Sequence, residues 1–164
     1  MADATAFRQA WSTFPTGVSV VTTIQPDGQV HGMTANGINS VSLEPLLVLA
    51  CIGHTANSHT LIQDSGRFAI SVLSEDQRSI GEYYARSVEK RVGDVEVSFS
   101  FTKEGAAFVD GGLAAMDCRV VDQYEAGDHT IFIGEVDEIE VNPGRPLVFF
   151  EGKFGRLTPE GFLA

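Results

Sequence analysis

The chain has 164 residues, of which 43% are hydrophobic and 20% are charged, the composition of an ordinary globular protein. This length favours one domain over residues 1–164, large enough to bury a real core. The 22 acidic and 11 basic residues give a formal net charge of −11, which argues against nucleic-acid and anionic-membrane partners because both require a basic surface. The longest apolar run, 46–52, is too short to cross a bilayer.

Cysteine usage and the N-terminus indicate a reducing compartment. Cys51 and Cys118 stand far apart and form no CxxC motif, which argues against a disulfide framework and a cysteine-rich zinc site. The opening residues lack the basic-then-apolar pattern of a signal peptide. We therefore expect a cytoplasmic protein. Residues 1–50 carry only four charged side chains, so this part of the chain is expected to be buried or to line a ligand site.

The N-terminal part predicts a helix followed by a β-hairpin. Apolar residues in segment 5–14 recur at the spacing of an amphipathic helix, with Asp3 or Thr5 as its cap. Residues 17–24 are alternating and β-branched, which is typical of a strand. A turn signal follows, and a second strand is expected near 29–38.

The remainder of the chain predicts mainly strands. Ser74 and Gln77 occupy the positions of a capping box, so a helix is expected from there to about Arg86. Residues 87–105 show no clear period and are expected to be mostly loop, with a candidate strand at 95–101. The other expected elements are a short helix at 54–63 and strands at 46–53, 67–73, 113–123, 130–141, 147–151 and 153–157.

This arrangement predicts a mostly-β fold. The strands are not separated regularly by helices, which argues against a doubly wound parallel sheet. A closed or partly closed antiparallel barrel with a few flanking helices is the expected architecture.

Familiar catalytic motifs are absent from the sequence. It contains no GxxxxGK[ST], no GxGxxG and no GxSxG pattern. His54 and His59 are five residues apart, an offset that does not align two ligands on one face of a helix, so capping or surface roles are favoured and no metal is expected. Asp128 and His129 follow Gly127 in a predicted turn, but no serine stands out as their nucleophile, which favours an exposed turn pair.

The segment 33–42, MTANGINSVS, is the most informative part of the sequence. It is free of charge yet dense in small hydroxyl and amide side chains, each of which needs a hydrogen-bond partner when buried. Small side chains also let a ligand approach the backbone closely. The pattern fits a site for a flat heterocycle with a polar rim, or an edge strand and loop with solvated hydroxyls.

A phosphate site is indicated by the segment 54–60, HTANSHT, just before a predicted helix. Hydroxyls and free N–H groups at a helix start suit a phosphate, although simple N-capping gives the same pattern. Arg86, Lys90 and Arg91 follow the next predicted helix, either as the cations of this site or as part of a solvated loop.

Several blocks together resemble a known family. In chain order they are FRQAWSTFPTGVSVVTT, HGMTANGINSVSLEPLLVLACI, NSHTLI, GRFAISVLSEDQ, AGDHTIFIGEV and LVFFEGKFGRL. Over about residues 7–157 the chain is similar to the short-chain flavin reductases, FMN-binding split-barrel proteins that act as reductase components of two-component flavin monooxygenases. The resemblance implies an antiparallel split barrel and a homodimer with flavin near the subunit interface.

The resemblance also implies a set of site residues. The positions that would border the isoalloxazine and ribityl chain are Thr34, Ala35, Asn36, Ser40, Val41 and Ser42, followed by Cys51 and Ile52 on the next strand. Those near the flavin phosphate would be Ser58 and Thr60. Arg86 and Lys90 are candidate cations from their place after the predicted helix and not from the resemblance, since segment 88–97 departs from the family pattern. Phe154 stands where the family often has a tyrosine, and His129, in the family's GDH turn, would position the nicotinamide dinucleotide.

The implied activity is hydride transfer from NADH, or NADPH, to FMN or FAD, with the reduced flavin passed to a separate flavin-dependent oxygenase. Such a reaction needs neither a protein nucleophile nor a metal. Three alternatives stay open at this point: a non-enzymatic FMN-binding electron carrier on the same barrel, an oxidase of another small molecule, and a barrel that binds no flavin.

Overall fold

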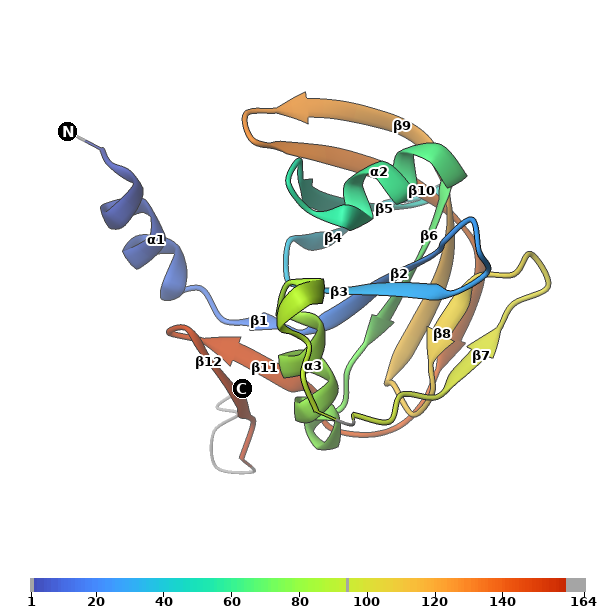
Figure 1. The fold of residues 1–164 in the computed structure, drawn as a ribbon. Helices are drawn as coiled ribbons and strands as arrows, with labels where there is room; N and C mark the ends of the chain where they lie inside the picture. Colours follow the sequence, from blue (N-terminus) through green and yellow to red (C-terminus); the bar gives the residue numbers. More distant parts are fainter. Residues whose placement is uncertain (1, 94, 159–164) are drawn as a thin grey trace.

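The computed structural model describes residues 2–93 and 95–158, and β-strands dominate these two segments (Figure 1). The strands are β1 (Thr16–Gly17), β2 (Ser19–Ile24), β3 (Val30–Ala35), β4 (Ile38–Leu43), β5 (Leu46–Gly53), β6 (Arg67–Val72), β7 (Phe99–Phe101), β8 (Ala107–Val109), β9 (Ala114–Ala126), β10 (His129–Val141), β11 (Leu147–Phe150) and β12 (Lys153–Arg156). The helices are α1 (Ala4–Ser12), α2 (Asn57–Ser65) and α3 (Arg78–Tyr84), with the short 3-10 helices η1 (Glu75–Gln77) and η2 (Val88–Lys90).

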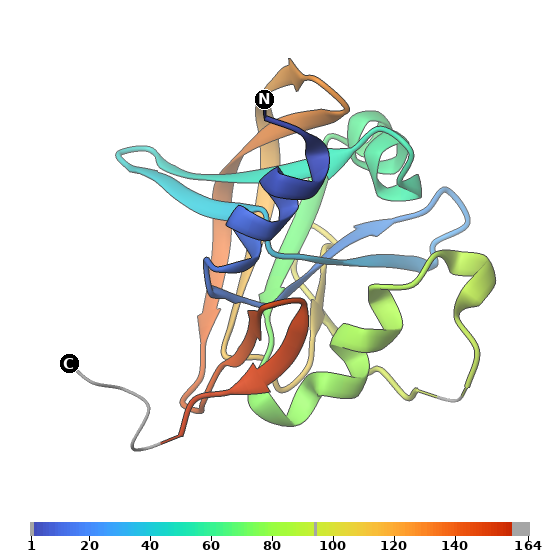
Figure 2. The same ribbon diagram turned by 90° about the vertical axis from the view of Figure 1, so that its left-hand side faces the viewer.

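Seven strands form one antiparallel sheet in the order β3-β2-β6-β9-β10-β5-β4. The sheet curves around its core, as the two views in Figures 1 and 2 show. β3 and β4 are consecutive in the chain but occupy opposite edges, so the barrel is split between them. Asn36 and Gly37 cross this gap, and a Cβ added to Gly37 would lie 3.2 Å from the Cβ of Cys51. The expected antiparallel split barrel is confirmed.

The inside of the barrel is filled by apolar side chains. The main cluster contains Val21, Val48, Ala50, Ile52, Ile62, Phe68, Ile70, Cys118 and Phe132. Ile62 belongs to α2, which therefore closes one end of the barrel. Burial raises the pKa of the Cys118 thiol to about 12, so this thiol stays protonated and unreactive at neutral pH.

Smaller elements pack around the sheet. β1, β11 and β12 form a three-stranded sheet, and β7 pairs with β8. The helix α1 has no buried residue and stands clear of the barrel in Figure 1, capped by the Asp3 carboxylate, which accepts hydrogen bonds from two backbone N–H groups. The expectation of burial in the first third of the chain is therefore wrong for α1 within the single chain, whereas a ligand-lining role of this helix stays a prediction. No helix in the described segments is long and apolar enough to span a membrane.

Most predicted elements are present, with shifts at their ends. The capping box of Ser74 and Gln77 is confirmed, and it opens η1 and then α3. The strand expected at 29–38 ends at Ala35, and residues 38–43 form the separate edge strand β4, in which Asn39 and Ser40 are exposed and Ser42 is half-buried. The three-residue strand β8, inside no predicted element, pairs with β7 and is buried.

Gly134 on β10 offers a direct test of the packing. A Cβ at this position would lie 2.7 Å from Cζ of Phe68 and 2.8 Å from Cβ of Cys118, closer than the core can accept without shifting. We expect Gly134→Ala to lower the free energy of unfolding by about 1–3 kcal/mol, as overpacking does. Urea denaturation measures this change. The matched variant Gly155→Ala, where an added Cβ has no neighbour within 4 Å, should differ from wild type by much less; equal effects would contradict the packing described here.

Candidate functional site

A cavity of about 370 Å³ lies beside the free edge of β3. Its walls come from three places: β3, the start of α2, and the segment from the end of α3 through η2. Thr34, Ser58 and Arg86, three of the residues expected at the site, lie in these walls. Residues that are far apart in the sequence are therefore brought together at the split in the barrel.

A second hollow of about 170 Å³ adjoins this cavity, since Thr34 and Ala85 line both. Its other walls include Ala35, Asn36 and Phe154. The Phe154 ring packs edge-on against Phe149, with the ring centroids 5.3 Å apart. The two hollows together offer a polar end near α2 and a flatter, more apolar end near the aromatic pair.

The start of α2 gives the cavity an anion-binding end. Its N-cap is Ala56, which has no side-chain oxygen, so no side chain caps this helix start. Ala56, Asn57 and Ser58 all line the cavity. A helix N-terminus attracts negative charge through its N–H groups and its dipole. The structure thus lacks the simple N-cap that was the alternative interpretation of this segment. The phosphate interpretation stays a prediction.

Arg91 is the cation most firmly held at the cavity. Its Nη2 donates to the carbonyl oxygen of Gly32 on β3 at 2.7 Å, and its Nε donates to that of Arg86 at 3.2 Å. Its guanidinium lies 5.0 Å from the ring centroid of Tyr84, within cation–π range. Arg91 therefore pins the η2 segment to the edge of the barrel and places positive charge in the cavity wall.

The positions of these cations are only partly those expected from the sequence. Arg86 lines the cavity, whereas the exposed Lys90 does not. Among the three neighbouring cations in the sequence, Arg91 is the one whose side chain reaches β3. This contact joins residues 59 positions apart, so no local sequence pattern encodes it. His31 and Tyr84 also line the cavity without having been expected there.

His31 and Ser58 form a buried pair in the cavity wall. Nε2 of His31 lies 2.9 Å from Oγ of Ser58, and both side chains are buried. Burial, together with the nearby charge of Arg91, lowers the pKa of His31 from its ordinary value of 6.5, which favours the neutral ring at neutral pH. The pair fixes the first turn of α2 against β3.

Seven of the residues expected to bind flavin lie outside both hollows. Ser40, Val41 and Ser42 are on β4 at the opposite edge of the split, and Cys51 is on the neighbouring β5. Ile52 is fully buried in the core. Thr60 is exposed on α2, as Lys90 is on η2. The roles of these residues stay predictions.

His129 lies at the turn between β9 and β10, as expected. Its Nδ1 is 2.7 Å from Oδ1 of Asp128, and the hydrogen bond and charge of His129 hold the pKa of the Asp128 carboxyl below its usual value. A Cβ on Gly53 would lie 3.5 Å from Nε2 of His129, an ordinary van der Waals distance, so the ring packs beside the end of β5. The role of His129 toward a dinucleotide stays a prediction.

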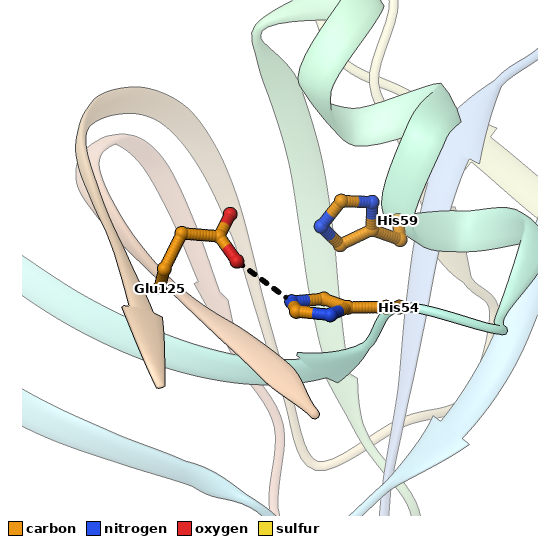
Figure 3. A group of neighbouring side chains, drawn as sticks. All are labelled: His54, His59 and Glu125. Atoms are coloured by element: carbon orange, nitrogen blue, oxygen red, sulfur yellow. Dashed lines mark ion pairs between the residues drawn. The ribbon is translucent and has the colours of Figure 1, made fainter. Parts of the chain in front are cut away.

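One expectation about the histidines is wrong in its geometry. His54 precedes α2, which begins at Asn57, so His54 and His59 do not share one helix. The chain turns between them and brings both ring nitrogens toward Glu125 of β9 (Figure 3). The offset of five residues therefore does not keep the two rings apart, because only His59 lies on the helix.

The buried His31 makes stability depend on pH. Below pH 6.5 the unfolded chain takes up a proton on this ring, whereas the folded protein does so only at lower pH, because its pKa is lowered. The free energy of unfolding should therefore fall as the pH drops below 6.5, by at most about 1.4 kcal/mol per unit from this group. In His31→Gln this part of the slope should be missing. Urea denaturation between pH 7.5 and 5.5 measures it, and identical slopes would contradict the assignment.

Comparisons with known proteins agree with this geometry. The family profile described as "Flavin reductase like domain" matches residues 11–158. The actinorhodin polyketide dimerase of Streptomyces coelicolor is 40% identical over 158 residues, which cover 95% of this chain and 88% of that protein. The NADH-dependent flavin reductase of a Rhodococcus species is 37% identical over 163 residues, covering 94% and 90% of the two chains.

Two further similarities bear on the type of flavin reductase. The reductase component of the 4-nitrophenol 4-monooxygenase/4-nitrocatechol 2-monooxygenase of Rhodococcus opacus is 34% identical, covering 96% of this chain and 83% of that one. The solved structure of flavin reductase PheA2 in its native state is 42% identical with a TM-score of 0.88, covering 96% and 99% of the two chains. On this evidence, the chain belongs to the flavin reductase family.

Proposed function

We propose that the protein is an NADH-dependent flavin reductase, which transfers a hydride from NADH to FMN or FAD and supplies the reduced flavin to a separate monooxygenase. The observation that carries the proposal is the cavity between β3 and the uncapped start of α2, with Arg86 and Arg91 in its wall. The relatives support it: one is an NADH-dependent flavin reductase and another is the reductase component of a monooxygenase.

The residues present fit a flavin. Its phosphate would lie at the first turn of α2, near Ser58 and Arg91, where N–H groups and positive charge meet. The ribityl chain and ring would extend past Thr34 toward Asn36 and Phe154 in the adjoining hollow. The small Ala35 leaves the backbone there open to close approach, which fits the polar rim of a ring.

The protein's part in the reaction is binding and orientation. The flavin, when bound, supplies the hydride-accepting chemistry. Backbone N–H groups of the 34–42 segment would stabilise negative charge at its polar edge, and His129, held by Asp128, would position the dinucleotide. No step in this scheme requires a protein nucleophile.

A non-enzymatic electron carrier is less well supported, since two of the three curated relatives named above are reductases and none is named as an electron carrier. Those names also favour NADH over NADPH. Cys51 and Cys118 are both free thiols, which suits the reducing cytoplasm as the proposed compartment.

We also propose that the protein works as a homodimer. Phe7 and Trp11 of α1, and Phe14 just after it, are between 59% and 69% exposed, although the Trp11 ring packs against the rings of both phenylalanines. They form one wall of a groove of about 370 Å³, whose other wall contains Asn36 and Phe149. These last two residues also line the cofactor hollow, so a second copy seated in the groove would lie beside the site.

The central test is NADH oxidation by the purified protein, with and without added FMN or FAD. We expect oxidation that rises with added flavin.

Arg91→Gln should weaken FMN binding at least about tenfold, which corresponds to about 1.4 kcal/mol, because a cation at the phosphate end is lost. Arg145→Gln removes a cation that is exposed and far along the chain, and should leave the FMN affinity unchanged. No oxidation of NADH or NADPH with any flavin would contradict the proposed function.

Sedimentation velocity tests the dimer. We expect the wild-type protein to sediment as a dimer and Trp11→Glu to sediment as a monomer, because a charge would be buried in the apolar groove. Val92→Glu, which changes an exposed apolar residue outside the groove, is the matched control and should remain dimeric. A monomeric wild-type protein at micromolar concentration would contradict the proposal.

A further inference from the structure

A cluster of potential metal ligands lies outside the flavin cavity. His54 comes from the loop between β5 and α2, His59 from α2, and Glu125 from the end of β9. One ligand atom from each lies within 4.8 Å of the others. In Figure 3 the three side chains converge on one space between the hairpin and the helix. We propose that this cluster binds a divalent metal ion of the Zn²⁺, Co²⁺ or Ni²⁺ type.

The donor set matches this class of metal. Two imidazole nitrogens and one carboxylate are ligands that zinc and its neighbours prefer, whereas magnesium and calcium prefer oxygen alone. Three protein ligands leave at least one position for water, and the cluster is open for it: the side chain of His54 is 36% exposed and that of Glu125 is 68% exposed. An ion can therefore enter from solvent.

The Thr130 hydroxyl shows that the ligand atoms share a centre. Its Oγ1 lies 2.8 Å from Nε2 of His59, 3.2 Å from Nε2 of His54 and 3.1 Å from Oε1 of Glu125. Nε2 of His54 is also 2.9 Å from Oε2 of Glu125. Both rings thus already direct Nε2, a usual metal-binding atom, toward one point, with Thr130 as the floor of the site.

The site is rigid on one side and adaptable on the other. The His59 ring packs on the buried Phe132, with ring centroids 5.6 Å apart, and Thr130 is itself buried. Glu125 is exposed at the hairpin end and can move inward by the ~1 Å that separates hydrogen-bond distances from metal–ligand distances of about 2.1 Å. A bound ion would tie the β9–β10 hairpin to α2.

This inference is independent of the proposed function, because none of the three ligands lines either flavin hollow. The alternative is a metal-free network in which the His54–Glu125 pair and the Thr130 hydrogen bonds are the whole of the interaction. The metal site and the metal-free network differ in one measurable respect, which is the affinity of the protein for a metal ion in the absence of flavin and NADH.

The test is titration of the chelator-treated, untagged protein with Zn²⁺ by calorimetry and with Co²⁺ by visible absorption. We expect one ion per chain with micromolar or tighter affinity, and Co²⁺ bands typical of low coordination. Saturating Zn²⁺ should raise the Tm by about 5 °C, because binding to the folded state stabilises it. His59→Gln and Glu125→Gln should each weaken binding at least tenfold. Glu125 is exposed, so its variant puts folding at little risk.

The control is Glu138→Gln, which removes an exposed carboxylate from β10 outside the cluster and should leave the affinity unchanged. Three results would overturn the site: no binding at 1 mM metal, binding that survives in both ligand variants, or an equal loss in Glu138→Gln, which would indicate general attraction to the acidic surface. Flavin-dependent NADH oxidation, measured separately, tests the proposed function without reference to the metal.

Discussion

Two strands that follow each other in the chain, β3 and β4, lie at opposite edges of the seven-stranded sheet. The barrel therefore cannot close by hydrogen bonding at this point, and an edge strand presents backbone groups that need other partners. Arg91 satisfies one of them, the carbonyl of Gly32, and in doing so anchors the segment that forms the far wall of the cavity. The position of the candidate site is thus a consequence of the split.

The split also explains how an acidic protein can hold an anionic ligand. The net charge of −11 repels anions at long range, but the cavity collects the local features that attract them. The uncapped start of α2 faces the same space as Arg86 and Arg91. Neutral His31 holds Ser58 without adding a charge that would have to be buried. Recognition would then rest on a few placed groups and not on a basic surface.

Sequence patterns predicted the parts of the structure that depend on local chemistry. The β-branched runs, the capping box and the turn at Gly127 are encoded within a few residues, and so the strands, η1 with α3, and the position of His129 were predictable. β4 was not predicted as a strand separate from β3, because its small polar residues are also typical of a loop. The contact of Arg91 with β3 and the approach of His54 and His59 to Glu125 could not be predicted. Both depend on contacts between segments that are distant in the sequence, and the spacing of residues along the chain does not encode such contacts.

The most direct measurement compares FMN with riboflavin, which lacks the phosphate, in equilibrium binding to the same protein by flavin fluorescence. If the start of α2 and Arg91 hold a phosphate, FMN should bind at least about tenfold more tightly than riboflavin, a difference of about 1.4 kcal/mol. Equal affinities for the two ligands would contradict the claim that the split in the barrel creates a phosphate-anchored flavin site.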